Sequence, residues 1–439
     1  MYKNILMIGC GGLGKALLYC LRHVDMKLNI SKLIIIEPNE LTVGVEIPKI
    51  YVNSFQHIKM KLTKDNFRSI FDKIIKQIKI DMIWDCSVAT GAMDFLKYSL
   101  DHDINYINTS MEDWPDKNHW NGKGDRDNLI RHSLQFTERK ALKLKGKKTA
   151  VLSCGMNPGL VEIFVKIALD RLQEKYKIKG DSYGEIAHNL GLETIHISEI
   201  DTQVSSINKK DNIFYNTWSP TGLQEEATDP IQLGWGSHEE PIEKSTKYNQ
   251  QIILPIRSMD KKCQSFEPMQ KKFEGYLIPH MEAATITEYL THKDYRPSAY
   301  YVYKPPKDAI RCLQKIKKNK YKINYDTHIF TSQEIDSGYD SVGVLLLFKN
   351  KKAYAMHTVL DNTFAKTISP NINATMIQTA CGFIIAIDHI LNNPNDGVTE
   401  VLDLDHWRSF KLVRKLLGKV YCGHVPYNPQ SNTFNYLAI

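Results

Sequence analysis

The sequence predicts an α/β protein in which a first domain with a parallel sheet, residues 1–155, precedes a larger α+β domain, residues 156–439. Three observations support this fold class. Short apolar runs alternate with helical patterns up to about residue 155, and a glycine-rich turn joins the first run to the first helical pattern. Beyond about residue 160 the segments are longer and richer in aromatic residues. We expect the C-terminal part to pack back onto the first domain.

The first apolar run ends in the pattern G-x-G-x-x-G, which is typical of a dinucleotide-binding site. Gly9 allows the tight turn, Gly11 lets the backbone approach a pyrophosphate, and Gly14 lets the helix pack closely on the strand. Gly12 and Leu13 belong to the same turn, where free N–H groups and the helix dipole attract the anion. With its flanking strand and helix, this pattern predicts a Rossmann NAD-binding domain.

A second strand is expected over residues 32–37, and it ends at an acid about 20 residues beyond the glycines. This acid, Glu37, is placed to accept a hydrogen bond from a ribose 2′-hydroxyl. A carboxylate at this position favours NAD, because it repels the additional phosphate of NADP.

Two further strands of the first domain are expected over residues 81–87 and 105–110, and both end in small side chains. In an open parallel sheet, the ligand lies beyond the carboxyl ends of the strands. The residues at these ends that we expect to line the nicotinamide half of the site are Ser87, Val88, Thr109 and Ser110.

A further strand-like run, residues 150–155, leads into a helical pattern that starts near a proline. Pro158 fits the first helical position and Asn157 fits the N-cap before it. Capping alone would explain Asn157, but its place at a strand end beside the cofactor also makes it a candidate site residue. Another long helix is expected from about residue 373 to residue 391.

Composition and charge narrow the classes of function. A hydrophobic content of 42% and a charged content of 24% describe an ordinary soluble protein. The apolar runs 342–348 and 381–387 are much shorter than the roughly 20 residues that span a bilayer. The N-terminus is itself the first predicted strand, so we expect a cytoplasmic protein with no signal peptide and no membrane partner.

The eight cysteines occur singly, without any C-x-x-C pair, so neither a disulfide framework nor a metal site is expected. The formal net charge is +8, and five of the lysines lie between residues 315 and 322, a pattern that can indicate nucleic-acid binding. These lysines alternate with apolar residues, which is more typical of the exposed face and end of a surface helix. We therefore expect no nucleic-acid partner.

Eight segments of the chain resemble the bacterial-type homospermidine synthases, which are relatives of the saccharopine dehydrogenase-like oxidoreductases. The resemblance extends over nearly the whole chain. Its most specific strings are H-I-x-E-x-D-T-Q at residues 196–203, N-T-W-S at 216–219 and L-G-W-G-x-H-E at 233–239. The other segments are 9–14, 109–115, 154–159, 295–297 and 373–375.

This resemblance implies a reaction in which a diamine such as putrescine loses a hydride to NAD. The resulting imine releases ammonia when a second amine attacks it, and the new imine is reduced by the same NADH. The net result is aminobutyl transfer from putrescine or spermidine, without net redox change. The resemblance also implies polyamine substrates, a homodimer, and a larger domain that serves substrate binding and dimerisation.

By the same resemblance, Glu112, Glu199 and Glu226 occupy the acidic positions of the active site. A diamine is positively charged at both ends near neutral pH, and an unpaired buried ammonium is costly, so the site must supply carboxylates. One acid can anchor the distal ammonium, and another can take a proton from the reacting amine before hydride transfer. Which acid performs each task stays open at this point.

The resemblance also assigns Trp218, whose indole face would stabilise the cationic iminium by about 0.5 to 2 kcal/mol. His280 matches the family pattern, and an ordinary imidazole pKa suits proton transfer. Asn157 would contact substrate or nicotinamide, whereas Asp201 could simply orient its neighbours. Ala89 stands where the family has an aspartate, which leaves the fine substrate preference open.

Two other functions stay open. A dehydrogenase of the saccharopine or carboxynorspermidine type would need a cationic clamp for a substrate carboxylate, and Arg296 is the candidate. A nucleotide-sensing or polyamine-binding regulator could keep the fold without the reaction. The net charge of +8 does not attract cationic substrates, so a polyamine site requires a locally acidic pocket.

Overall fold

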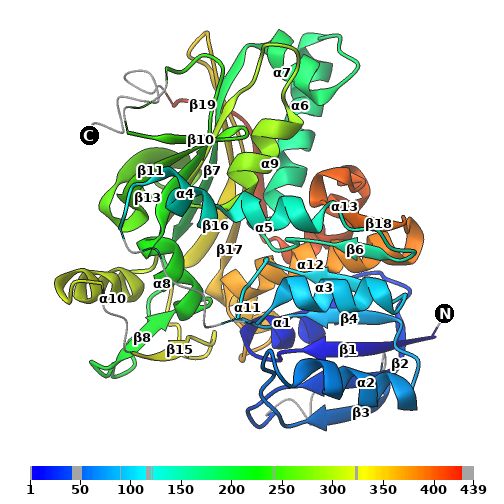
Figure 1. The fold of residues 1–439 in the computed structure, drawn as a ribbon. Coiled ribbons are helices and arrows are strands. Elements are labelled where there is room, and N and C mark those ends of the chain that lie inside the picture. The colour runs from blue at the N-terminus through cyan, green and yellow to red at the C-terminus, as the bar shows by residue number, and fades with distance from the viewer. Residues whose placement is uncertain are drawn as a thin grey trace.

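The computed structural model describes residues 2–41, 52–88, 90–114, 120, 122–240, 242, 244–321 and 325–427. Two sheets form the framework, a seven-stranded sheet near the N-terminus and a ten-stranded sheet built by later residues (Figure 1). A separate two-stranded sheet consists of β8 (Ile213–Asn216) and β15 (Asp326–Ile329).

The seven-stranded sheet is parallel throughout. Its order is β18-β6-β5-β4-β1-β2-β3, which contains the strand order of a doubly wound dinucleotide-binding fold. The predicted α/β class with an N-terminal Rossmann-like domain is therefore confirmed. The strands are β1 (Tyr2–Ile8), β2 (Asn29–Ile36), β3 (Val52–Ile58), β4 (Met82–Asp85), β5 (Asn105–Asn108), β6 (Thr149–Val151) and β18 (Gly397–Thr399).

Helices cover both faces of this sheet. On one face, α2 (Phe67–Gln77) and α3 (Ala92–Asp101) pack their aromatic side chains against the strands. On the other face lie α1 (Gly12–Cys20) and α12 (Ala374–Asn392), which pack against each other. The C-terminal half of the chain therefore contributes one strand and one helix to the N-terminal sheet.

Helix α12 is long and apolar enough to cross a membrane by length and composition alone. However, 83% of its most apolar window is buried inside the molecule. The ring of Phe383 on this helix lies 6.2 Å from that of Trp84 on β4. A core helix accounts for this apolar character.

The ten-stranded sheet has the order β10-β11-β9-β14-β7-β16-β17-β19, with β13 paired to β14 and to β12. Neighbouring strands are antiparallel except for β14 and β7. The strands are β7 (Leu192–Asp201), β9 (Pro230–Gly234), β10 (Thr246–Tyr248), β11 (Gln251–Arg257), β12 (Lys262–Glu267), β13 (Lys271–Ile278), β14 (Ser298–Lys304), β16 (Tyr339–Phe348), β17 (Ala353–Asp361) and β19 (Lys419–Val425).

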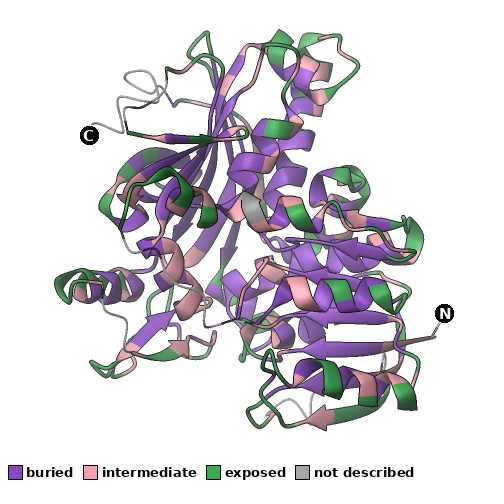
Figure 2. Cartoon of the chain, in the orientation of Figure 1, coloured by how far each residue is buried: buried purple, intermediate pink, exposed green. Residues whose placement is uncertain are grey.

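The remaining helices pack on the ten-stranded sheet, on the two-stranded sheet or on other helices (Figure 1). They are α4 (Arg126–Arg131), α5 (Leu134–Ala141), α6 (Leu160–Tyr176), α7 (Tyr183–Leu190), α8 (Pro220–Thr228), α9 (Met281–Tyr289), α10 (Lys307–Lys318), α11 (Asn362–Ile368) and α13 (His406–Val413), with short 3-10 turns at Leu21–His23, Ser258–Asp260, Val401–Asp403 and Arg414–Leu416. One hydrophobic cluster runs from α1 and α12 through α6 to β7, so both sheets share a core (Figure 2).

Several local expectations can be compared with these elements. The predicted long helix is confirmed, since α12 begins after Asn373, whose side chain caps the Met376 N–H. The lysine-rich helix is also confirmed as an amphipathic surface helix, α10. The predicted N-cap at Asn157 is wrong, because α6 begins at Leu160 with Gly159 at the N-cap. The strand expected over residues 105–110 ends earlier, at Asn108.

Candidate active site

A cavity of about 510 Å³ lies where the carboxyl ends of β1, β4 and β5 approach β7, β14 and α8. It is lined by residues from both halves of the chain. Fifteen of the sixteen predicted site residues border it, the exception being Gly14. The fifteen are Gly9, Gly11, Gly12, Leu13, Glu37, Ser87, Val88, Thr109, Ser110, Glu112, Asn157, Glu199, Trp218, Glu226 and His280.

The glycine turn between β1 and α1 forms one wall of the cavity. Gly9 has a φ of +80°, and a Cβ on it would lie 2.9 Å from the carbonyl oxygen of Cys86. A Cβ on Gly14 would lie 2.8 Å from the carbonyl oxygen of Gly9, so the start of α1 needs glycine to approach the turn. A Cβ on Gly11 would meet nothing within 4 Å. This turn therefore offers open space next to backbone N–H groups, as a bound pyrophosphate requires.

Glu37 lies just after β2 and is buried at the edge of the cavity. Its Oε2 accepts a hydrogen bond from the backbone N–H of Cys10 (2.9 Å), and its Oε1 accepts two from Asn39. Two carboxylate oxygens have about four acceptor positions, which leaves one for a ribose hydroxyl. Glu37 thus supports the glycine turn and is available to a nucleotide.

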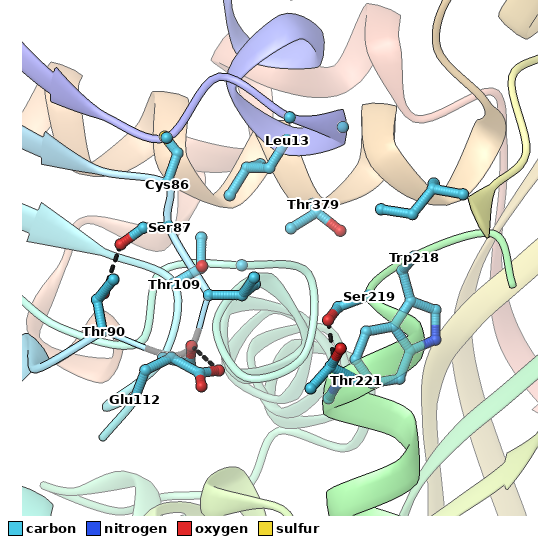
Figure 3. Close-up of a pocket in the computed structure, with 18 of the residues that line it drawn as sticks. Leu13, Cys86, Ser87, Thr90, Thr109, Glu112, Trp218, Ser219, Thr221 and Thr379 are labelled. Carbon is cyan, nitrogen blue, oxygen red and sulfur yellow. Dashed lines mark hydrogen bonds between the residues drawn. The ribbon is translucent and has the colours of Figure 1, made fainter. Parts of the chain in front are cut away.

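Small hydroxyl side chains line the cavity next to the glycine turn (Figure 3). The hydroxyls of Ser87 and Thr90 lie 2.6 Å apart, and Ser110 donates to Glu112 Oε1 at 3.0 Å. Thr109 lies between these pairs in Figure 3. Ala89, the position at which the sequence lacks the family aspartate, lies outside the described residues.

Glu199 projects from β7 and is buried at the opposite wall. Its Oε2 accepts hydrogen bonds from the Asn157 side-chain amide and from the Tyr301 hydroxyl, each at 2.6 Å. Burial raises the pKa of Glu199 to about 7, although both hydrogen bonds lower it. A carboxyl group with this pKa is present in both protonation states near neutral pH, which suits it to proton transfer.

The bond to Glu199 gives Asn157 a different role from the predicted cap. Asn157 lies three residues before the start of α6, and its amide donates across to β7 instead of bonding to the helix. Sequence alone could not distinguish these roles, because an asparagine before a proline and an apolar helix satisfies the capping pattern.

Asp201, two residues after Glu199 on β7, joins three of the family strings. Its Oδ2 accepts from the Thr217 hydroxyl at 2.6 Å and from the Thr375 hydroxyl at 3.2 Å, and its Oδ1 accepts from the backbone N–H of Gln203 at 2.8 Å. Asp201 is absent from the residues that border the cavity and are described. Its position fits the expectation that it orients its neighbours, above all the Trp218 segment.

Trp218 follows β8 and forms the wall opposite the glycine turn (Figure 3). Its indole N–H donates to the hydroxyl of Tyr303 at 3.0 Å. The rings of Tyr301 and Tyr303, which project from the same face of β14, are stacked with centroids 5.7 Å apart. The indole is therefore held by its N–H edge and half-buried, with its ring available to the cavity.

His280 lies between two carboxylates at the start of α9. Its Nε2 is 3.4 Å from Glu226 Oε1, and its Nδ1 is 2.9 Å from each oxygen of Glu282. Burial lowers the pKa of the imidazole, but the charges of Glu282 and Glu226 outweigh this effect and the pKa rises to about 10. The prediction of an ordinary imidazole pKa for proton shuttling is thus wrong, since His280 is an imidazolium at neutral pH.

Charge on the cavity wall is mainly acidic. The described lining residues include the carboxylates Glu37, Glu112, Glu199 and Glu226, and the cations Lys61 and His280. None of these described lining residues is an arginine. Arg296, the predicted clamp for a substrate carboxylate, instead donates from Nε to the carbonyl oxygen of Trp235.

Several residues of the site were not predicted. Tyr301 and Tyr303 alternate along β14 directly after the Y-R-P string, and Thr375, Met376 and Thr379 come from the first turns of α12. The alternation of aromatic residues after that string is the one local signal for the tyrosines. Nothing local indicates that the start of α12 reaches the cavity, because this depends on its packing against α1.

Comparison with known families gives two matches that together span most of the chain. Residues 5–151 match the family described as saccharopine dehydrogenase NADP binding domain, and residues 155–420 match the family described as saccharopine dehydrogenase C-terminal domain.

Relatives of known function are similar over nearly their full length. A homospermidine synthase of Blastochloris viridis is 30% identical, with 97% of this chain and 92% of that protein covered. A second homospermidine synthase, from Mesorhizobium japonicum, is 27% identical, with 97% and 91% covered.

Two solved structures have a similar fold. The crystal structure of a homospermidine synthase from Legionella pneumophila in complex with NAD has a TM-score of 0.84 and 27% identity, covering 98% of this chain and 94% of that one. The apo saccharopine dehydrogenase (L-Glu forming) of Saccharomyces cerevisiae has a TM-score of 0.54 and 11% identity, covering 96% and 99%. The second similarity concerns the fold alone.

Proposed function

Because the chain belongs to the saccharopine dehydrogenase family and is an enzyme of the homospermidine synthase type, we propose that it transfers an aminobutyl group from one diamine to another. Putrescine is the proposed donor and acceptor, and homospermidine and ammonia are the products. The observation that carries this proposal is the meeting of a nucleotide-type glycine turn with Glu199, Glu226 and Trp218 in one cavity.

NAD is the proposed cofactor, and the residues present fit it. The glycine turn and the start of α1 would hold the pyrophosphate, and Glu37 would accept from the adenosine ribose. When bound, NAD supplies the hydride acceptor for amine oxidation and the donor for the final reduction. Although the matching family is described as NADP binding, the buried carboxylate of Glu37 supports NAD in this chain.

Glu199 is the proposed base for the reacting amine. An ammonium group must lose a proton before its carbon can give up a hydride, and a carboxylate with a pKa of about 7 can take that proton near neutral pH. Asn157 and Tyr301 fix the carboxylate by bonding to Oε2. The same group would return protons during release of ammonia and during reduction of the second imine.

Glu226 is the proposed partner of the distal ammonium. One of its oxygens faces His280, whereas its Oε2 has no hydrogen-bond partner among the described residues. A buried carboxylate oxygen without a donor is costly, so it favours a bound ligand that donates. An alkylammonium group supplies three N–H donors.

Trp218 is the proposed support for the iminium. A cation over an indole face is stabilised electrostatically, by about 2 kcal/mol when the pair is desolvated. The bond from its N–H to Tyr303 leaves the ring face free of this contact and fixes its orientation. An aromatic ring suits this task because it attracts the cation without attacking its carbon.

The test is incubation of the purified protein with putrescine and a catalytic amount of NAD, followed by mass spectrometry of the products and an ammonia assay. We expect homospermidine and equimolar ammonia with no lasting rise in NADH absorbance. Putrescine deuterated on the carbon next to nitrogen should give homospermidine that keeps its label, because the removed hydride returns. Net NADH formation would instead support a dehydrogenase. Absence of any product would contradict the proposed aminobutyl transfer.

The geometry disfavours the dehydrogenase alternative, because the described cavity wall has no arginine and its lysine, Lys61, follows β3, which is paired with the strand that leads to Glu37. The homodimeric state stays a proposal based on the resemblance, and the cytoplasmic location stays a proposal as well. Light scattering of the purified protein tests the first of these.

A further inference from the structure

Behind the cavity, a second acid supports the histidine that contacts Glu226. Glu282 is the second residue of α9 and is fully buried. It does not border the cavity, at least among the residues described there, and the proposed reaction gives it no task. Both of its oxygens lie 2.9 Å from Nδ1 of His280. The carboxylate therefore meets Nδ1, whereas the other ring nitrogen faces Glu226 on the cavity wall.

The other nitrogen of His280 links this contact to the cavity. Nε2 lies 3.4 Å from Glu226 Oε1, so the three side chains form a carboxylate–imidazole–carboxylate row. The face of the His280 ring packs on Tyr301 at a centroid distance of 4.3 Å, and the same tyrosine donates to Glu199. Both proposed working acids thus depend on groups that touch His280.

Other ionisable groups around this row are already engaged. On α5, Glu138 accepts from the Ser153 hydroxyl at 2.9 Å, and on α6, Glu162 accepts from the Thr285 hydroxyl. Burial raises the pKa of Glu138 to about 8 and raises the pKa of Glu162 well above its ordinary value. These two acids hold protons near neutral pH and do not replace Glu282 as the counter-ion of His280.

We propose that Glu282 is a positioning residue, which keeps His280 charged and oriented so that Glu226 stays ionised and ready to bind the distal ammonium of the diamine. The proposal rests on the proposed function, because it assigns that ammonium to Glu226. Removing the charge of Glu282 would leave a buried imidazolium with one counter-ion fewer. The ring would then lose its proton more easily. Burial raises the pKa of Glu226, and the charge and hydrogen bond of His280 lower it, so Glu226 would lose the neighbour that offsets its burial. The charge of Glu282 also raises the pKa of Glu226 directly, but this effect is smaller than that of His280.

Glu282→Gln tests this proposal, since the amide keeps the shape and removes the charge. We expect the His280 titration, followed by NMR of labelled histidine, to move from about 10 towards neutral pH. We expect KM for putrescine to rise about tenfold in mildly alkaline solution and much less in mildly acidic solution, as for loss of one charge-assisted contact. The change in kcat should be smaller than the change in KM.

Glu288→Gln is the matched control, because it removes a partly exposed charge from the last turn of the same helix. It should leave the His280 titration and the pH dependence of KM unchanged. Glu282→Asp keeps the charge, so the His280 titration in this variant should stay close to that of the unsubstituted protein. This variant replaces Glu282→Gln in the test if the glutamine variant does not fold. The proposal is overturned if Glu282→Gln shifts neither the His280 titration nor the pH dependence of KM, or if Glu288→Gln shifts both equally.

Failure of the proposed function gives a different result. If the unsubstituted protein forms no homospermidine, the aminobutyl transfer is wrong, whereas the His280 titration still reports whether Glu282 holds the ring charged. Putrescine binding measured by calorimetry without NAD then replaces KM. Unchanged putrescine binding in Glu282→Gln at alkaline pH would contradict the positioning role.

Discussion

The two halves of the cavity are built in different ways. The nucleotide half is built around one contiguous stretch, β1, the glycine turn and α1, whose backbone N–H groups are joined by Glu37 and by hydroxyl side chains at the neighbouring strand ends. The carboxylate half is made of side chains that come from β7, α8, α9 and β14, and those chains hold one another through hydrogen bonds. The nucleotide half can therefore be specified locally, whereas the carboxylate half exists only once the ten-stranded sheet has formed.

The two halves also differ in how their charges respond to pH. At the nucleotide half, the helix terminus supplies a fixed partial charge that pH does not alter. At the carboxylate half, the pKa of Glu199 is raised to about 7 and that of His280 to about 10. Changes at the second half should therefore alter turnover and its pH dependence, and changes at the first half should alter cofactor binding.

The largest expected effect is a loss of kcat that leaves NAD binding unchanged. Glu199→Gln keeps the hydrogen-bond acceptor for Tyr301 but removes the base, so kcat should fall about 10²- to 10⁴-fold. NAD affinity, measured by calorimetry, should stay within about twofold of the unsubstituted protein because no contact of the glycine turn changes.

Glu239→Gln is the control for this variant, because Glu239 is a buried acid bonded to Tyr300 on the opposite face of β14. It should lower the thermal stability without a comparable loss of kcat. A similar loss of kcat in both variants would mean that the sheet, and not the base, was disturbed.

Glu37→Ser probes the nucleotide half alone. The lost contacts to Cys10 and to the ribose should weaken NAD binding by about 10- to 100-fold, which corresponds to about 1.5–3 kcal/mol for a charged hydrogen bond. Discrimination against NADP should fall at the same time, because the repelling carboxylate is gone. Glu40→Ser, at an exposed acid three residues further on, should change neither affinity.

Trp218 gives a graded effect in the carboxylate half. Trp218→Leu should lower kcat by about 2- to 30-fold, the equivalent of about 0.5–2 kcal/mol of cation–π stabilisation. Trp218→Phe keeps a weaker aromatic face, so its kcat, measured by steady-state kinetics, should lie between those of the unsubstituted protein and the leucine variant. Equal activity of the leucine and phenylalanine variants would contradict a role for the π-face.

The smallest effect concerns the pH dependence of stability. Burial raises the pKa of Glu138 to about 8, of Glu199 to about 7 and of Asp201 to about 6, all above their values of about 4 in an unfolded chain. The folded protein thus binds more protons, so the stability that these groups contribute is full below about pH 4 and is lost as pH rises through about 6 to 8. The melting temperature should fall as pH rises through this range, and Glu138→Gln should make its dependence on pH less steep.

The same contrast explains what the sequence could predict. The glycine turn, Glu37 and the strand ends at Ser87 and Thr109 follow from local patterns, and the cavity borders all of them. The raised pKa of His280 was not predicted: its larger cause, Glu282, is only two residues away in sequence, but that spacing does not by itself indicate contact, and its second cause, Glu226, belongs to a different helix. The role of Asn157 was ambiguous for the same reason, since its partner Glu199 lies on a strand of the second sheet.

Asp201 shows how the specific strings acquire a physical meaning. The strings at residues 196–203, 216–219 and 373–375 are distant in sequence, yet Thr217 and Thr375 both donate to this one carboxylate. A resemblance can identify such strings, but only the fold tells which of their residues touch substrate and which hold the others in place.

The shared use of α12 limits how far this protein can be divided. A fragment that stops near residue 155 would lack β18 and would leave the face of α1 without its covering helix. A fragment of the remainder would carry an apolar helix with nothing to pack on. The cofactor-binding part could be exchanged between relatives by recombination in nature or by chimera design in the laboratory. Such an exchange should succeed only when α12 is exchanged together with it.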